Sequence, residues 1–203
     1  SYQNAILTNL FNFMTFVDGI FYIVVLIMSI VLHEFAHGYA AYLLGDNTAK
    51  MSGRLTLNPI KHLDLFGSII LPLLLIISKT GFLIGWAKPV PYNPNNLRGK
   101  NGNLIVALAG IGANLLLVII FSLLIRLAPM VGIAPYDVLS PIPFYKITTI
   151  IVLLNLVLAF FNLIPIPPLD GSKILFSLLP PSLRSLEDFL NKWGIFFLLF
   201  FII

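Results

Sequence analysis

Long runs of apolar residues, separated by shorter polar segments, dominate this chain. Three of the runs, residues 18–44, 104–127 and 145–165, reach the length of about 20 residues that a helix needs to cross the hydrocarbon core of a bilayer. Polar, glycine and proline residues gather between them. The pattern predicts an all-α membrane protein, a polytopic helical bundle that forms a single integral-membrane domain over residues 1–203.

The other apolar stretches are too short to span a bilayer. Residues 66–91 are interrupted by Pro72, and we expect them to form a re-entrant segment. Residues 54–57 alternate between polar and apolar, which favours a short β-like segment. We expect residues 193–203 to form a partial, half-inserted helix unless the apolar stretch continues further. Residues 1–18 contain no Lys or Arg and are expected to lie at the interface or to be partly inserted.

Composition agrees with the apolar pattern. Of the 203 residues, 59% are hydrophobic and 10% are charged, whereas a soluble domain has about 45–50% and about 25%. The net charge of +4 comes from basic residues that are scattered along loops, so lipid is the expected environment and nucleic acid is not an expected partner. The absence of cysteine excludes disulfides and thiolate metal sites.

A zinc-binding pattern lies inside the first apolar run. His33 and His37 are four residues apart, which places both imidazoles on one face of a helix with Glu34 beside them. Ionisable groups are costly inside a membrane span, at about 2.5–3.5 kcal/mol for a central Asp, Lys or Arg, and this favours a function for the cluster. Glu34 is free to transfer protons, so a third ligand must come from elsewhere. Asp170, which follows the last long run and a proline-rich break, is the candidate; the alternative for Asp170 is a helix N-cap.

A shared metal imposes a topology. His33 and His37 lie near the end of the first span, and Asp170 lies just after the end of the last span. These two helices must therefore run in the same direction, since antiparallel spans would separate the ligands by roughly 30 Å. This requires residues 66–91 to enter and leave on one side of the membrane.

The segments HEFAHGYAAYLLGD and FNLIPIPPLDGSKIL together resemble the site-2 protease family of intramembrane zinc metalloproteases, in its compact branch without a PDZ domain. The intervening GRLTLNPIKHLDLFGSIILP and GWAKPVPYNP look like the same branch, although a proline would be expected after Asp64. The resemblance covers residues 20–180. It implies an endopeptidase that cleaves transmembrane segments of membrane-protein substrates, in regulated intramembrane proteolysis. It also implies one Zn²⁺ per chain at His33, His37 and Asp170, catalysis by Glu34, and substrate contact at Asn162.

Three further groups of residues carry weaker expectations. The extended, proline-bounded segment with Trp86, Lys88 and Pro89 could bind an unwound substrate as an added strand, or it could simply anchor the chain at the interface. Gly110 and Asn114 are expected to be close-packing positions without a chemical role. His62 and Asp64 could bind a surface metal, but we expect them to be solvated loop residues.

An intramembrane zinc or proton transporter is the alternative function, because broken helices with intramembrane His, Glu and Asp also describe ion pathways. The basic loops place the active site nearer the cytoplasmic face of a prokaryotic cell membrane. The sequence defines neither the individual substrate nor the oligomeric state.

Overall fold

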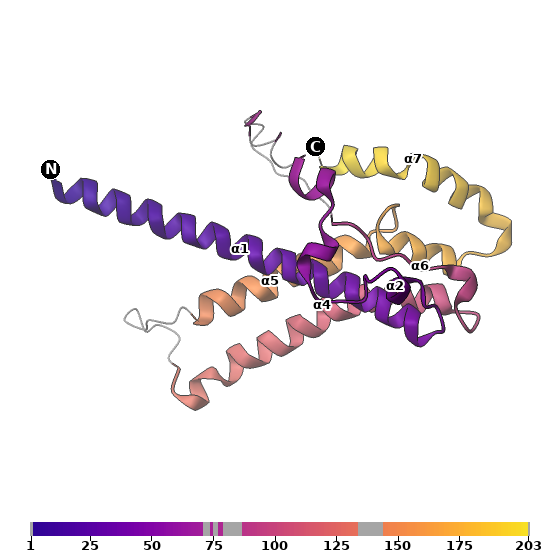
Figure 1. Cartoon of the computed structure of the whole chain (residues 1–203), viewed down its shortest axis with the longest axis horizontal. Coiled ribbons are helices and arrows are strands. Elements are labelled where there is room, and N and C mark those ends of the chain that lie inside the picture. Colours follow the sequence, from indigo (N-terminus) through magenta and orange to yellow (C-terminus); the bar gives the residue numbers. More distant parts are fainter. Residues whose placement is uncertain (1, 71–73, 75–76, 79–86, 134–143, 203) are drawn as a thin grey trace.

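The computed structural model describes residues 2–70, 74, 77–78, 87–133 and 144–202, and the regular elements among them are all helices (Figure 1). The longer helices are α1 (Tyr2–Leu43), α4 (Gly102–Leu127), α5 (Phe144–Leu163), α6 (Asp170–Leu178) and α7 (Arg184–Ile202). The short elements are α2 (Thr48–Met51), η1 (Pro59–His62), the π-helix η2 (Leu65–Ile70), η3 (Pro94–Asn96), η4 (Ala128–Val131) and η5 (Pro181–Leu183). The prediction of an all-α membrane protein is confirmed.

Among the described residues, three segments are long and apolar enough to cross a membrane: Gly19–Leu43, Gly102–Val131 and Phe144–Leu163. Their outer faces expose large apolar side chains; Leu116, Val157 and Phe160 are each more than half exposed. Such continuous apolar surface is typical of helices that face lipid. The protein is therefore an integral membrane protein, as the three long apolar runs predicted.

Helix α4 lies at the centre of the bundle and packs against α1, α5 and α6. Small residues make these close contacts possible: Ala41, Ala107 and Ala159 are completely buried. Without a hydrophobic effect between helices in lipid, close approach of backbones supplies much of the packing energy. In Figure 1, α1 crosses the molecule diagonally with α4 and α5 beneath it.

The three long helices meet with α1 and α5 parallel and α4 antiparallel to both. His37, near the end of α1, contacts Val106, near the start of α4, and also contacts Asp170, which follows α5. A backbone hydrogen bond from Arg98 N to Leu44 O (2.8 Å) joins the end of α1 to the approach to α4. The whole connection between α1 and α4 therefore starts and ends at the same end of the bundle.

The N-terminal segment differs from its prediction. Residues 2–18 do not form a separate interfacial segment but continue α1 without a break. The physical reason is that residues 2–18 contain neither proline nor glycine, so no residue there ends the helix.

The β-like segment at residues 54–57 is also absent, because these residues form no strand. Among the residues that the structure describes, no second strand lies beside them: the Arg54 N–H closes a turn on Ala49 O (2.9 Å), and Asn58 caps η1 through Ile60 N (3.0 Å). The polar Arg54 is buried and the apolar Leu57 is exposed, so the alternating pattern belongs to a loop and does not mark a strand.

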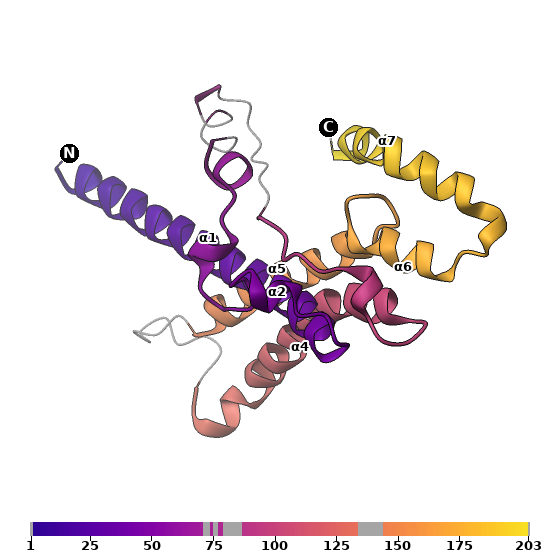
Figure 2. The same ribbon diagram turned by 45° about the vertical axis from the view of Figure 1, so that its right-hand side comes forward.

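The chain just before the segment 66–91 and the last residues of that segment lie side by side. Lys88 N donates to His62 O at 2.9 Å, so the chain returns to the place from which it left. Figure 2 shows η2, which follows η1, standing away from the three long helices. This arrangement supports a re-entrant segment, whose depth in the bilayer remains a prediction.

At the C-terminus, the apolar residues 193–202 form the second half of α7, which begins at Arg184. Charged residues occupy the first half, and the structure does not give α7 the apolar length of a span. At Gly194, α7 passes close to the turn before α6, since a Cβ there would lie 2.9 Å from Pro167 Cδ.

Candidate metal centre

His33, His37 and Asp170 converge at one buried point. His37 Nε2 lies 2.8 Å from Asp170 Oδ2, and His33 Nε2 lies 3.0 Å from that oxygen and from His37 Nε2. All three side chains are buried. The structure thus brings together three ligand-type residues from α1 and α6 that lie far apart in the sequence, as the topology argument required.

The outer ring nitrogens of both histidines are already used. His37 Nδ1–H donates to the carbonyl oxygen of Val106 at 2.7 Å, and His33 Nδ1–H donates to Asn114 Oδ1 at 2.6 Å. A backbone carbonyl can only accept, so His37 must carry its proton on Nδ1. Both Nε2 lone pairs are then left to face the Asp170 carboxylate. Partners of this kind fix the tautomer and orientation of metal-binding histidines.

This donor set fits a zinc ion. Two unprotonated imidazole nitrogens and one carboxylate oxygen repel one another at 2.8–3.0 Å unless a cation lies between them. A tetrahedral zinc site with bonds of about 2.0–2.1 Å separates its ligand atoms by about 3.3 Å, so the observed spacing needs little change. Three protein ligands leave one position open, which is typical of catalytic rather than structural zinc sites.

Gly110 of α4 forms the floor of this centre. A Cβ at Gly110 would lie 2.5 Å from His37 Cε1 and 2.7 Å from His33 Cε1, and it would overlap His37 Nε2. Only a residue without a side chain lets α4 pass this close to the imidazoles. The sequence correctly indicated close packing at Gly110, but did not indicate that the packing partners are the two histidines.

Asp170 is the first residue of α6, which begins directly after the proline-rich break. Gly171 allows α6 to start against the end of α5, since a Cβ there would overlap the carbonyl oxygens of Leu163 and Ile164. Asp170 Oδ2 faces the histidines while Oδ1 accepts from Lys173 Nζ at 2.9 Å. Burial lowers the pKa of Lys173, but the carboxylate of Asp170 outweighs it and holds that pKa above its ordinary value.

A chain of buried amides connects the centre to all three long helices. Asn114 Nδ2 donates to Asn155 Oδ1 at 2.8 Å, and Asn155 Nδ2 donates to Ser29 Oγ at 3.0 Å. Asn114 and Asn155 are completely buried. Asn114 is therefore not merely a packing position: its amide is fixed from behind so that its carbonyl oxygen faces His33.

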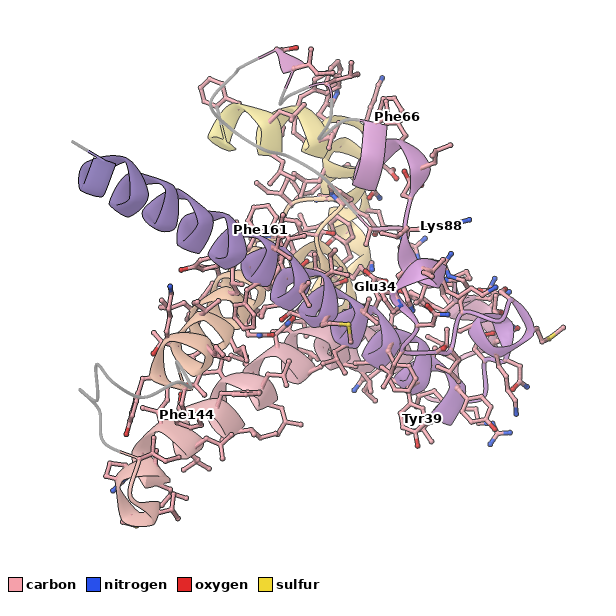
Figure 3. The ribbon with its side chains drawn as sticks, turned by 60° about the vertical axis from the view of Figure 1, so that its left-hand side comes forward. Glu34, Tyr39, Phe66, Lys88, Phe144 and Phe161 are labelled. Carbon is pink, nitrogen blue, oxygen red and sulfur yellow. The ribbon has the colours of Figure 1, made fainter. Side chains whose placement is uncertain are left out.

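Glu34 lies on α1 beside His33, at the centre of the molecule in Figure 3, which also labels Lys88. Its Oε2 accepts a hydrogen bond from the backbone N–H of Val90 at 2.8 Å. The returning end of the segment 66–91 thus lies against Glu34.

The residues expected to bind substrate do not converge on one point as the three metal ligands do. Trp86 lies outside the described residues. Lys88 and Pro89 are exposed beside Val90, and the Asn162 amide donates to Leu158 O at 2.9 Å within α5. His62 is not solvated as expected: it is 2% exposed, and its Nε2–H donates to Thr56 O at 2.8 Å.

Sequence reasoning did not assign a supporting role at the metal centre to Asn114, Asn155, Lys173 or Val90. The two asparagines are polar residues inside predicted spans, and this position in the sequence could have drawn attention to them. The structure shows that both are completely buried. Val90 could not have been found in this way, because its contribution is a backbone N–H.

Comparison with known proteins agrees with this geometry. The model of peptidase family M50 matches residues 124–201. "Putative zinc metalloprotease YwhC" of Bacillus subtilis (strain 168) is 41% identical over 182 residues, which are 89% of this chain and 79% of that protein. "Putative zinc metalloprotease Rip2" of Mycolicibacterium smegmatis is 33% identical over 87% of this chain and 64% of its own length. Rip2 of Mycobacterium tuberculosis (strain H37Rv) is 30% identical over 82% and 59%.

No solved structure matches the chain. The relative with 41% identity is covered over most of its length, and the buried His–His–Asp group supplies the donors that a zinc enzyme needs. The chain belongs to peptidase family M50, the site-2 protease family, and is a membrane-embedded zinc metalloprotease.

Proposed function

We propose that this enzyme is an endopeptidase that cleaves transmembrane segments of other membrane proteins inside the bilayer, in regulated intramembrane proteolysis. The observation that carries the proposal is the position of the buried His33, His37 and Asp170 group, within helices whose outer surfaces are apolar. A metal centre enclosed by spanning helices is reached most directly by a substrate that is itself in the membrane.

In this proposal, His33 Nε2, His37 Nε2 and Asp170 Oδ2 hold the zinc ion. When bound, zinc supplies a Lewis acid and lowers the pKa of the water it holds to about 7. Glu34 takes a proton from the attacking water and returns it to the leaving amine. Asn114 and the Val106 carbonyl keep both imidazoles in the orientation that this requires.

The substrate has to unwind locally before it can be cut, because carbonyl groups in a helix are hydrogen-bonded and shielded. We propose that Asn162 and the segment of Trp86, Lys88 and Pro89 contact the unwound chain. Lys88 N–H is already bonded to His62 O, and the carbonyls of Lys88 and Pro89 accept from Arg54 Nη2 at 2.7 and 3.4 Å. Contact at Lys88 and Pro89 is therefore expected through their side chains.

The basic residues support an orientation with the metal centre nearer the cytoplasmic face of a prokaryotic cell membrane. Among the 12 Lys and Arg residues, only Arg126, in the last turn of α4, and Lys146, in the first turn of α5, flank the connection between these two helices. The others belong to segments that leave or enter the bundle at the metal-centre end. Cytoplasmic loops near spanning helices collect basic residues.

The test is cleavage of a model transmembrane helix by the purified protein in lipid vesicles, compared with Glu34→Gln at equal zinc content. We expect the Gln variant to lose at least about 10²-fold in kcat, the range for removal of a general base. Equal activity of the two proteins would exclude the role of Glu34. Zinc flux across sealed vesicles without any proteolysis would instead support the transporter.

A further inference from the structure

One backbone N–H in the segment returning to α4 is aimed at Glu34. Val90 lies between Pro89 and Pro91, and neither proline has an N–H, so Val90 supplies the sole backbone donor of residues 89–91. That donor is 2.8 Å from Glu34 Oε2. We refer to residues 89–91 as the proline clip.

The proline clip has a restricted backbone and a fixed seat on α1. Each proline fixes its own φ, and the residue before a proline is held near extended conformations. The Val90 side chain is buried over Gly38, where a Cβ would lie only 2.7 Å from Val90 Cγ1. Gly38 lies four residues after Glu34, on the same face of α1, so the side chain and the N–H of Val90 dock side by side.

Buried polar groups of the connection between α1 and α4 hold the chain on both sides of the proline clip. Before it, His62 O accepts from Lys88 N, and Arg54 Nη2 donates to Lys88 O at 2.7 Å. After it, Asp46 Oδ2 accepts from Asn93 N at 2.8 Å. Asp46 is completely buried and Arg54 nearly so. Burial of a charged group is costly unless the group forms hydrogen bonds. Arg54 and Asp46 form theirs with the backbone just before and just after the proline clip, and so hold that segment in place.

A carboxylate that transfers protons must present one oxygen in a defined direction, and a free glutamate side chain rotates among several rotamers. The hydrogen bond from Val90 occupies Oε2 and leaves Oε1 for the reacting water. We propose that the proline clip is a positioning device for Glu34, which selects the rotamer in which Glu34 can act as general base. This inference rests on the proposed role of Glu34.

Hydrogen exchange tests the contact without any catalysis. In zinc-free protein labelled with ¹⁵N-valine, the Val90 amide should exchange slowly in the wild type. It should exchange about tenfold faster in Glu34→Ala, which removes the acceptor, and remain slow in Glu34→Gln, whose carbonyl oxygen still accepts. Equal Val90 exchange in the wild type and in Glu34→Ala would overturn the inference.

Replacement of Val90 by its α-hydroxy acid tests the function, because the resulting ester lacks the N–H but keeps the side chain. We expect kcat to fall by about 10- to 100-fold through misorientation, with KM within about twofold and zinc content unchanged. The matched control is the same ester at Asn95, whose exposed N–H bonds to its neighbour Asn93 Oδ1 (3.0 Å), and it should keep wild-type kcat.

The outcomes separate this inference from the proposed function. If Glu34→Gln abolishes cleavage while the Val90 ester keeps wild-type kcat, the proline clip is only structural and the role of Glu34 stands. If the ester loses zinc in proportion to activity, or raises KM alone, positioning of Glu34 is likewise overturned. If Glu34→Gln cleaves normally, the proposed function fails first.

Discussion

At the scale of single residues, the metal centre depends on groups that hold no metal. Val106 contributes a carbonyl, Asn114 an amide and Gly110 the absence of a side chain. Each acts on an imidazole, and each comes from α4, which carries none of the three ligands. Substitutions in α4 should therefore change metal binding without touching a ligand.

Gly110→Ala should prevent zinc binding. The added Cβ would occupy the space between the imidazoles, 2.5 Å from His37 Cε1 and 2.7 Å from His33 Cε1. Zinc content after purification, measured by atomic absorption, should fall by about tenfold or more. Gly112→Ala, on the same helix, is the matched control, because a Cβ at Gly112 would meet nothing within 4 Å. Zinc retained by Gly110→Ala would contradict the described geometry.

Asn114→Leu should weaken zinc binding without removing a ligand. The substitution leaves His33 Nδ1 without its acceptor at 2.6 Å and Asn155 without its donor at 2.8 Å. Loss of such a partner typically costs about 10- to 100-fold in metal affinity. Competition with a chelator measures the affinity. Asn101→Leu, on an exposed side chain that makes no capping hydrogen bond, should leave it unchanged.

At the scale of elements, the connection between α1 and α4 holds the most unusual chemistry outside the centre. Asp46 is completely buried and accepts from Thr48 N, Thr48 Oγ1, Asn93 N and Asn96 Nδ2. Burial by itself raises the pKa of Asp46, but these hydrogen bonds outweigh it and hold the pKa below its ordinary value of 3.8. The ionised carboxylate thus ties η3 to the end of α1.

Asp46→Asn should destabilise the protein at neutral pH. An amide cannot accept all four hydrogen bonds, and we expect a loss of about 1–3 kcal/mol in the free energy of unfolding. Because the folded pKa lies below the unfolded value of 3.8, this stabilisation is present above pH 3.8 and is lost as pH falls through the folded pKa. Wild type and variant should therefore converge in acid.

Denaturation of zinc-free protein in detergent at several pH values measures this difference. Asp188→Asn, which changes an exposed carboxylate on α7, is the control and should follow the wild type throughout. A difference between wild type and Asp46→Asn that stays constant into acid would exclude Asp46 ionisation as its cause.

The elements differ in how far the sequence could predict them. The spans could be predicted because a bilayer demands about 20 apolar residues in a helix, and the third ligand because Asp170 follows such a span. The continuation of α1 before Gly19 could not, since a mixed polar and apolar pattern fits both an interfacial segment and an exposed helix. The contact of Val90 with Glu34 depends on a backbone N–H brought across 56 positions of the chain, which no local pattern encodes.

At the scale of the whole molecule, charge and connectivity agree with each other. The metal centre, both ends of the connection between α1 and α4, and α6 share one end of the bundle. The end of α4 and the start of α5 meet at the other end, where Tyr145 Oη donates to Ile133 O at 2.9 Å. Basic residues favour the first end by ten to two, since only Arg126 and Lys146 among 12 belong to the second. The membrane potential and the anionic lipids of the cytoplasmic leaflet both favour the orientation in which the end with more basic residues faces the cytoplasm.

Cysteine labelling tests this orientation in a chain that has no cysteine of its own. Met130→Cys places a thiol on exposed η4 at the α4–α5 end, and Asn95→Cys places one on exposed η3 at the metal-centre end. In intact cells, a membrane-impermeant maleimide should label the first and spare the second, and permeabilisation should expose both. The reverse pattern would place the metal centre at the outer face while leaving its geometry intact. Labelling of both thiols in intact cells would mean that the two ends do not lie on opposite faces, which would contradict three crossings of the membrane.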